Sequence, residues 1–333
     1  MKKFGLAAVV MLFAVSAMAS NFRAADQVYL PAAGKIASFA SDVYVSNPNS
    51  FPVTVSVIYA TTTAGTQTLF PNLFTLAAGE RREFIDFMGT AQPNGLGLGS
   101  ALGQLVFNGC KQNQDCGANT QDPNTGISPN FADITVESRI YSTAANGGTT
   151  GQLFSGLPWY TFASQDQQNN SLDTVFITGL RQSAGSGAGT YRANVGLVNA
   201  SQFSNTTMVV KLFRHDAAST RCGSDFRVQL LPLGQLQQNI SVMFPGCTGS
   251  FWATVNQESS TATGDSPVSC GSSGCAGFFA YGSVLDGVTN DATTMEAQYT
   301  KSLNSAQIAC IYPAPDQTVT CKSTPKMRRA VKH

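Results

Sequence analysis

Apolar and polar residues alternate with a period of two along much of the chain. Val53–Tyr59 and Asp133–Tyr141 follow this pattern, and shorter apolar or alternating runs occur at Val195–Val198, Met208–Phe213 and Phe251–Val255. A period of two places successive side chains on opposite faces of a β-strand. Because turn residues separate the runs at the spacing typical of a β-sandwich, the pattern predicts an all-β fold.

The predicted strands occur in the same order in two halves of the chain, as expected for two copies of one plan. Residues 28–31, 41–48 and 53–59 correspond to residues 175–178, 193–200 and 208–213. A Gly turn (76–80 or 231–235) and an apolar strand (84–87 or 240–244) follow in each half. Next come strands at 102–107 and 251–255, and then hairpin-like pairs at 134–141 with 151–154 and at 277–284 with 292–295.

Each half has about 130 residues and about seven strands, which is the size of an immunoglobulin-like sandwich. We therefore predict two tandem antiparallel Ig-like β-sandwich domains, at residues 20–163 and 174–300. A linker rich in Gln and Asn is expected at residues 164–173. Residues 301–333 are expected to form a C-terminal extension with a disulfide and a basic tail.

The N-terminus has the layout of a secretory signal peptide at residues 1–19. Lys2 and Lys3 precede the uncharged apolar run Phe4–Val15, and Ala17-Met18-Ala19 has the small-x-small pattern of a cleavage site before Ser20. The run is shorter than the roughly 20 residues that a membrane-spanning helix needs, and no transmembrane segment is predicted in the mature chain. We expect the mature protein in the periplasm, at the cell surface or in the medium.

All eight cysteines follow the leader, and an even number in an exported chain indicates disulfides. Spacing alone cannot fix the connectivity, so pairing between sequence neighbours is a hypothesis. The hypothetical pairs are Cys110–Cys116, Cys222–Cys247, Cys270–Cys275 and Cys310–Cys321. The alternative is zinc, which is disfavoured because neither short pair has a CxxC gap and the chain has only two histidines.

Charged residues make up 12% of the sequence, about half of the average share. Five of the basic residues lie in the last twelve positions, which contain no acid: Lys322, Lys326, Arg328, Arg329 and Lys332. The rest of the mature chain is therefore acidic, which argues against nucleic acid as a partner. We interpret the tail as solvated, with contact to anionic envelope polymers as the alternative.

The turn motifs resemble those of uncharacterised tandem β-sandwich modules in secreted bacterial proteins. The shared motifs are an opening apolar-Pro strand at residues 28–31, Asn47-Pro48, Leu76–Gly79, Ser138–Tyr141, Thr150-Gly151-Gln152, and Ser283–Asp286 with Asp291. The resemblance covers most of residues 28–300 and implies the sandwich fold, but it says little about function. The second half departs from the pattern where Asn199-Ala200 replaces the Asn-Pro turn.

Catalytic chemistry is not indicated. His215 is the one histidine inside the expected folded region, and no Gly-x-Ser-x-Gly elbow supplies a nucleophile for a Ser-His-Asp triad. The acids near strands do not single out a glycosidase pair: Asp86, Glu137, Asp286, Asp291 and Glu296. We predict no catalytic residues, no cofactor and no enzyme activity.

Two groups of residues are candidates for ligand contact. Asp286, Asn290 and Asp291 could hold Ca²⁺ through oxygen ligands, but the same residues could cap the backbone of a turn, which we favour. Trp159, Tyr160 and Tyr281 are candidates for stacking on a sugar. The alternative for Trp159, and for Trp252, is packing in a core or between domains.

The interpretation that we favour is a secreted or envelope-associated, non-catalytic structural or binding protein. Sandwich domains present variable loops from a fixed frame, and the long loops 110–130 and 258–275 are the expected contact surfaces for an envelope polymer, a glycan or a protein. The alternatives are a carbohydrate-binding protein and a hydrolase of unrecognised type. Strand donation to a partner is a weaker idea, because the sequence has no evident donor strand.

Overall fold

The structure is a computed structural model, and it is built almost entirely of β-strands. It describes residues 24–36, 39–62, 66–117, 120, 128–143, 149–158, 161–163, 165–166, 171–172, 174–202, 204–262 and 277–300. Within these residues there are 20 strands and one short helix, α1 (Ile240–Met243). Every strand pair among them is antiparallel. The predicted all-β antiparallel fold is confirmed.

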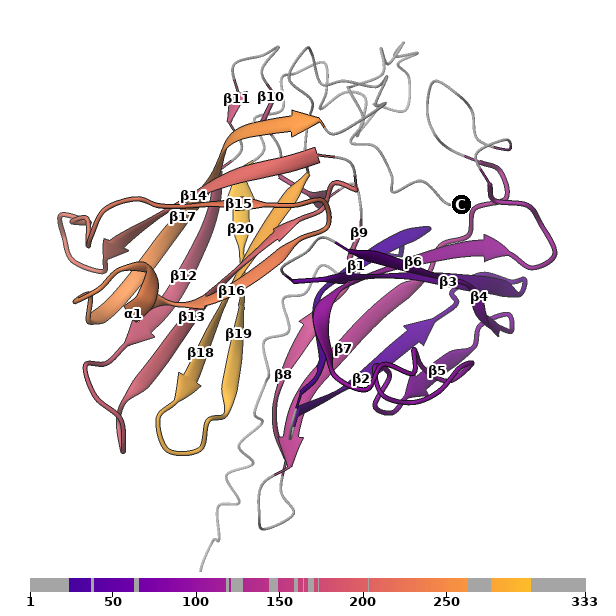
Figure 1. The fold of residues 1–333 in the computed structure, drawn as a ribbon, viewed down its shortest axis with the longest axis horizontal. Coiled ribbons are helices and arrows are strands. Elements are labelled where there is room, and N and C mark those ends of the chain that lie inside the picture. Colours follow the sequence, from indigo (N-terminus) through magenta and orange to yellow (C-terminus); the bar gives the residue numbers. More distant parts are fainter. Residues whose placement is uncertain are drawn as a thin grey trace, which may run out of the picture.

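Two sheets form a first sandwich, coloured indigo to magenta in Figure 1. The five-stranded sheet has the order β4-β3-β6-β1-β9, and the four-stranded sheet has the order β5-β2-β7-β8. The strands are β1 (Gln27–Lys35), β2 (Phe39–Ser46), β3 (Val53–Thr61), β4 (Gln67–Leu76), β5 (Arg81–Phe84), β6 (Ala101–Lys111), β7 (Thr135–Thr143), β8 (Thr149–Ser155) and β9 (Leu157–Pro158).

A second sandwich, coloured rose to yellow in Figure 1, has sheets of the same sizes. Its five-stranded sheet is ordered β15-β14-β17-β12-β20, and its four-stranded sheet is ordered β16-β13-β18-β19. The strands are β12 (Thr174–Gln182), β13 (Tyr191–Asn199), β14 (Ser204–Arg214), β15 (Phe226–Leu230), β16 (Gln235–Asn239), β17 (Gly249–Ala262), β18 (Phe278–Asp286), β19 (Ala292–Glu296) and β20 (Gln298–Thr300).

The two sandwiches have the same strand order when β12–β20 are matched to β1–β9 one by one. Irregularities match as well, because both β1 and β12 carry a register shift near the middle, between Leu30 and Ala33 and between Ile177 and Leu180. In the chain segment that connects the two sandwiches, β10 (Gln165–Asp166) pairs with β11 (Ser171–Leu172) inside the predicted linker. The predicted domain boundaries remain predictions, and residues 1–19 and 301–333 lie outside the described residues.

Each sandwich encloses its own apolar core, formed by alternate side chains of its two sheets. In the first, Val53, Val55 and Val57 of β3 face Val43 and Val45 of β2 across the core, and all five are fully buried. The second core is built in the same way from β12, β13, β14, β17 and β18. Since fully burying such a side chain contributes roughly 1.5–3 kcal/mol, the period-two pattern accounts for the two sheet-on-sheet cores.

Two predicted strands, at residues 84–87 and 240–244, are wrong. Residues 240–244 form helix α1 and its end rather than a strand, although their composition is that of a strand. The side chain of Asn239 caps this helix by accepting a hydrogen bond from the backbone N of Ser241 (2.8 Å) and another from its hydroxyl (2.6 Å). The corresponding strand of the first half ends at Phe84, and residues 85–88 form a turn. In both halves, a local cap or turn ends the edge strand early.

A buried asparagine closes the same turn in each sandwich. Asn47 Nδ2 donates to the carbonyl of Ala77 (2.8 Å), and Asn199 Nδ2 donates to the carbonyl of Leu231 (2.9 Å). Each Oδ1 accepts from the backbone N two residues onward, at 2.9 Å in both cases. The Asn-Pro turn and the Asn-Ala turn are therefore closed by the same hydrogen bonds, and the asparagine rather than the proline forms them.

We expect Asn47→Ala and Asn199→Ala each to lower the free energy of unfolding by about 1–3 kcal/mol, because each substitution removes the hydrogen bonds of a buried amide, including one to the buried carbonyl of Leu76 or of Leu230. The two losses should add in the double variant, since the sites are in separate cores. Urea unfolding of purified protein measures this, with the exposed Asn94→Ala as the control. Unchanged midpoints in both single variants would contradict the proposed role of the clamps.

The two sandwiches are joined by a third apolar cluster, which lies between sheets rather than within a sandwich. The outer face of the first five-stranded sheet packs here against the outer face of the second four-stranded sheet. The first sandwich and the connection after it contribute Tyr29, Ala32, Ile58, Ala60, Val106, Phe154 and Phe162; the second contributes Val198, Ala200, Leu233, Phe279 and Tyr281. The least buried of these residues, Phe279, is only 7% exposed, so the cluster itself is buried.

Aromatic rings and side-chain hydrogen bonds fix the geometry of this junction. Phe162 lies between Tyr29 of β1 and Phe279 of β18, at centroid distances of 4.6 and 5.5 Å. Phe154 of β8 packs edge to face on Tyr281 at 5.1 Å. Alongside, the hydroxyl of Thr294 in β19 donates to the carbonyl of Leu153 in β8 (2.7 Å). Two neighbouring edge strands are thus held side by side without forming a continuous sheet.

The ring of Tyr281 lies directly on Gly196 of the neighbouring strand β13. A Cβ added at Gly196 would stand 2.1 Å from Cζ of Tyr281, closer than atoms can approach. We therefore expect Gly196→Ala to push the ring out of the junction and to cost about 1–3 kcal/mol or more.

Thermal and urea unfolding measure this effect. Gly185→Ala is the matched control, because an added Cβ there has no atom within 4 Å. Equal stability of the two alanine variants would contradict the packing described for Tyr281.

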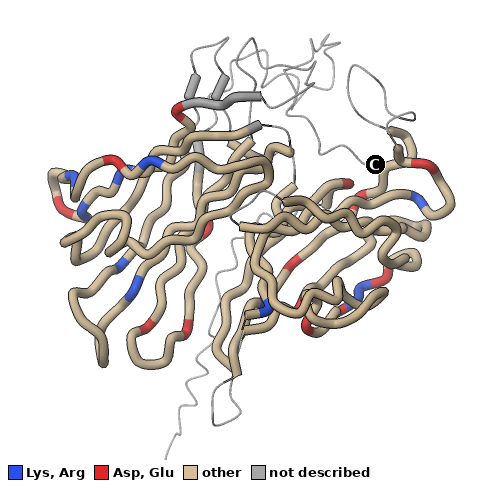
Figure 2. Tube along the Cα trace, viewed as in Figure 1, with Lys and Arg blue, Asp and Glu red and all other residues tan. Residues whose placement is uncertain are grey.

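Charged residues are few and scattered along the described chain (Figure 2). Among the described residues, no helix is both long and apolar enough to cross a membrane.

Candidate functional site

Two of the predicted disulfides are present in the structure. Cys110, near the end of β6, is bonded to Cys116 and closes a short loop. Cys222, in the connection between β14 and β15, is bonded to Cys247, which follows α1. Cys222 and Cys247 are buried, whereas Cys110 and Cys116 are half-buried. Cys270, Cys275, Cys310 and Cys321 lie outside the described residues.

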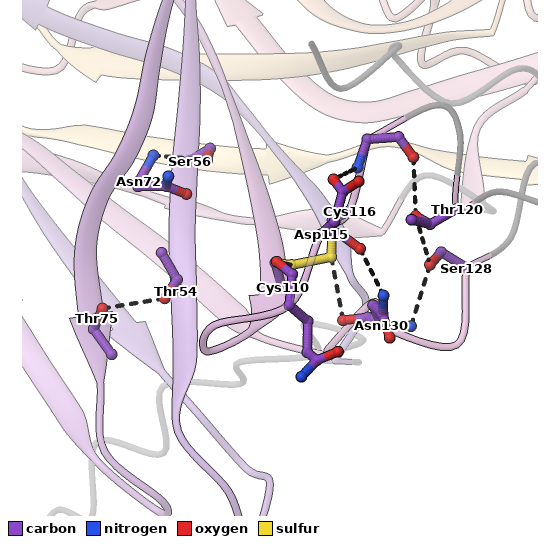
Figure 3. The surroundings of a disulfide bond; sticks show 12 residues. Thr54, Ser56, Asn72, Thr75, Cys110, Asp115, Cys116, Thr120, Ser128 and Asn130 are labelled. Atoms are coloured by element: carbon purple, nitrogen blue, oxygen red, sulfur yellow. Dashed lines mark hydrogen bonds between the residues drawn. A yellow bond between two sulfur atoms is a disulfide. The ribbon is translucent and has the colours of Figure 1, made fainter.

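The loop around Cys110–Cys116 is organised by hydrogen bonds (Figure 3). The backbone N of Gly117 donates to Oδ1 of Asp115 (2.7 Å), and Asn130 Nδ2 donates to the carbonyl of Asp115 (2.6 Å). The Ser128 hydroxyl donates to that of Thr120 (3.1 Å). This part of the predicted contact loop 110–130 is therefore a fixed turn; residues 118–119 and 121–127 lie outside the described residues.

The calcium candidates form a turn. Oδ1 of Asp286 accepts hydrogen bonds from the backbone N of Val288 (2.9 Å) and of Thr289 (2.9 Å) and from the Thr289 hydroxyl (3.2 Å). These bonds lower the pKa of Asp286, with the bond from the backbone N of Thr289 contributing most. Asn290 adopts φ 55°, and the carbonyl of Asp291 accepts from the backbone N of Asp286 (3.0 Å). The geometry is that of the turn that we favour, with this oxygen of Asp286 already occupied by donors.

The aromatic candidates do not form an exposed platform in the described structure. Trp159 and Tyr160 lie outside the described residues. The prediction of Tyr281 as an exposed stacking residue is wrong, because it is 4% exposed in the junction cluster. Its hydroxyl accepts from Gln235 Nε2 (3.0 Å) and donates to Gln237 Oε1 (2.9 Å), and burial strongly raises its pKa. Its ring forms part of the wall of a junction pocket of about 310 Å³.

Trp252 is neither in a core nor between the sandwiches. It lies half-buried on the outer face of the second five-stranded sheet, stacked on Phe213 at 4.2 Å and on Phe176 at 6.3 Å. The guanidinium of Arg221 covers the ring of Phe213 at 5.2 Å. Because Trp252 and Phe213 stack face to face, the ring faces that a sugar would need are already used.

The candidate acids and the histidine are distributed over both sandwiches. His215 is exposed after β14, and its neighbour Asp216 accepts hydrogen bonds from the hydroxyl (2.6 Å) and backbone N (3.0 Å) of Thr220, which lower the pKa of Asp216. Asp86 forms an ion pair with Lys35 (2.5 Å), and Glu296 accepts from the hydroxyl of Ser155 (2.9 Å). Glu137 is on β7 of the first sandwich, and Asp286 is on β18 of the second. They do not form a carboxylate pair.

A polar depression of about 630 Å³ lies at one end of the second sandwich and is larger than the junction pocket. It lies between the loop after β12, the segment around α1 and the start of the β18–β19 hairpin. Four amides line it, Gln182, Asn194, Asn239 and Asn290, together with Arg192, Asp286 and several hydroxyls. Asn239 Nδ2 donates to Asn194 Oδ1 (3.3 Å), so two of the amides are oriented by each other.

The sequence does not predict this pocket. Gln182 and Asn194 are on the consecutive strands β12 and β13, which belong to different sheets, whereas Asn239 is at the end of β16, which pairs with β13. The signal in the sequence is faint, because Asn239 also caps α1 and Asn290 also forms a turn. Amides and hydroxyls arranged in this way can donate to and accept from a ligand rich in hydroxyls.

Glu137 is the acid whose environment is most unusual on the outer face of the first four-stranded sheet. It is half-buried, and this loss of hydration raises the pKa of its carboxyl. On the paired strand β2, burial, a hydrogen bond to Glu83 and the neighbouring negative charges raise the pKa of Tyr44 to about 12. A partly dehydrated carboxylate therefore lies at the centre of a face that also carries tyrosines.

No family model and no curated protein matches the sequence. Among solved structures, one match is Bacteroides uniformis β-glucuronidase 2 covalently bound to cyclophellitol-6-carboxylate aziridine. It has 8% identity and a TM-score of 0.15 over 81% of this chain and 25% of that chain. This chain spans about a quarter of that protein's length, and at this TM-score the likeness carries no argument about fold or function.

We expect Glu137→Gln to stabilise the protein at neutral pH. A raised pKa in the folded state means that wild-type stability falls as the pH rises from the ordinary carboxyl value of 4.5 through the folded value. The glutamine cannot ionise, so the two stability curves should converge in acid and separate above this window.

Urea unfolding as a function of pH, at low protein concentration, measures the difference. Asp291→Asn controls for the loss of one negative charge, because Asp291 is exposed and forms no ion pair with any described residue. A Glu137→Gln variant that is less stable than wild type at neutral pH would show that the carboxylate has a partner within the chain.

Proposed function

We propose that the protein is a non-catalytic structural or binding protein that works outside the cytoplasm, in the periplasm, at the cell surface or in the medium. The leader-like N-terminus, the disulfides and the resemblance to tandem modules of secreted bacterial proteins support this placement. The observation that carries the proposal is the junction cluster. A buried aromatic contact that fixes two sandwiches in one frame suits a protein that presents surfaces, rather than one that closes around a substrate.

The polar pocket of the second sandwich is the surface on which we place a partner. Its lining of amides, hydroxyls and Arg192 favours hydrogen bonds to a ligand rich in hydroxyls, such as an envelope or extracellular glycan. This observation supports the alternative of carbohydrate binding, but through hydrogen bonds at the pocket. The stacked rings of Trp252, Phe213 and Phe176 do not support sugar stacking, because they cover one another.

A hydrolase remains the rival hypothesis, and the same experiment can address it. The mature protein is screened on a glycan array, and a bound polysaccharide is then incubated with it to look for shortened products. Binding with an intact polysaccharide supports the proposal. Shortened products that are lost in His215→Ala would contradict it.

We expect Ser186→Trp and Arg192→Ala each to weaken glycan binding about tenfold or more, because one fills the pocket and the other removes its cation. Both positions are exposed, so the fold should be unaffected. Ala188→Trp is the matched control, since it adds the same side chain to the same loop at an exposed position that does not line the pocket. Isothermal titration with a glycan identified on the array measures the change. Equal affinity of all three variants and wild type would exclude this pocket as the binding site.

A further inference from the structure

The junction between the sandwiches uses one face of each, and the common strand order defines the equivalents of both faces. In the junction, the outer face of the first five-stranded sheet meets the outer face of the second four-stranded sheet. By strand order, the outer face of the second five-stranded sheet is equivalent to that of the first five-stranded sheet. In the same way, the outer face of the first four-stranded sheet is equivalent to that of the second four-stranded sheet. These two faces take no part in the junction cluster.

Strand register identifies equivalent positions on the five-stranded sheets. Across the first, Ile58 of β3 pairs with Val106 of β6, which pairs with Tyr29 of β1. Across the second, Lys211 of β14 pairs with Thr254 of β17, which pairs with Phe176 of β12. Lys211 therefore occupies the position at which Ile58 enters the junction cluster.

The same comparison applies to the four-stranded sheets. Tyr281 of β18 pairs with Gly196 of β13, three residues before the clamp asparagine, Asn199. Glu137 of β7 pairs with Tyr44 of β2, three residues before the clamp asparagine, Asn47. Glu137 therefore occupies the position of Tyr281. Ile58 and Tyr281 of the junction thus have a cation, Lys211, and an anion, Glu137, at the equivalent positions of the two faces outside the junction.

The outer face of the second five-stranded sheet also carries a cluster of aromatic side chains. Trp252 and Phe213 occupy the positions that Gln104 and Ala60 occupy in the first sandwich. With Phe176 they form a half-buried stack over three adjacent strands, next to Lys211. Bulky rings here can supply the volume that Phe162 of the connecting segment supplies inside the junction.

The facing charges fit this pairing. Around Lys211, Asp225 forms ion pairs with Arg221 and Arg227, and Arg227 with Glu258. The charge of Lys211 also acts on Asp225, but Lys211 itself forms no ion pair with any described residue. Glu137 forms no ion pair with any described residue, although burial already removes part of its hydration. A cation brought against this carboxylate would offset that loss.

We propose that a second copy of this chain docks on the outer face of the second five-stranded sheet through the outer face of its own first four-stranded sheet, with Lys211 of one copy facing Glu137 of the other. The contact repeats the junction that the two sandwiches form within one chain. It is heterologous, so each copy keeps one face of each kind available. Association therefore proceeds head to tail and gives a ring or an open chain.

Charge reversal in the full mature chain tests the proposal. Sedimentation velocity should show concentration-dependent association of wild type, and Lys211→Glu or Glu137→Lys alone should weaken it at least tenfold. A mixture of the two single variants should associate, because the reversed faces complement each other, and the double variant should recover association by itself. Lys111→Glu, on a different surface, is the control for net charge and should behave as wild type.

Recovery in the mixture shows that each single variant is folded, so loss of association cannot be attributed to misfolding. A wild-type chain that stays monomeric at every concentration overturns the proposal and leaves this face to another part of the chain or to a different partner. Association that survives both single reversals also overturns it. Binding of glycan at the polar pocket is independent of either result.

Discussion

The packing of one outer sheet face on another, with Tyr281 lying on Gly196, determines most of what the molecule can do. A sandwich buries the inner faces of its sheets and normally leaves the outer faces to water. Here two outer faces lose their water to each other, and aromatic side chains fill the space between them. This contact turns two separate cores into one frame, and it determines which surfaces remain for partners.

The two sandwiches share a plan but differ where the junction requires it. The strand order, the central register shift and the asparagine clamps are common to both. The outer faces carry the differences: apolar at Ile58 and Tyr281, charged at Lys211 and Glu137. Because outer-face residues contribute little to the cores, those positions are free to specify contacts, whereas the inner positions are constrained to Val, Leu, Ile and Phe.

Much of the fold can be predicted from the sequence, since its causes are local. Alternation in Val53–Tyr59 predicts β3, the Asn turns predict where strands end, and the hypothesis that neighbouring cysteines pair is confirmed for two disulfides. Helix α1 escapes prediction because its residues have the composition of a strand and only the capping side chain of Asn239 decides otherwise.

The candidate site is less predictable for a physical reason. Burial of Tyr281 depends on a sheet from the other half of the chain, and the pocket amides meet only because two sheets and the β18–β19 turn come together at one end of the second sandwich. The periodicity of a strand shows that a side chain lies on its outer face, but it does not show what covers that face. The sequence therefore does not distinguish a buried outer-face aromatic residue such as Tyr281 from a partly exposed one such as Trp252.

The most direct test of the account is whether the two sandwiches tumble as one body in solution. Backbone ¹⁵N relaxation of the mature protein, measured at low concentration, reports the rotational diffusion of each sandwich separately. The buried junction predicts a single diffusion tensor that fits the amides of β1–β8 and of β12–β19 together. Two independent tensors, with shorter correlation times for each sandwich, would contradict it.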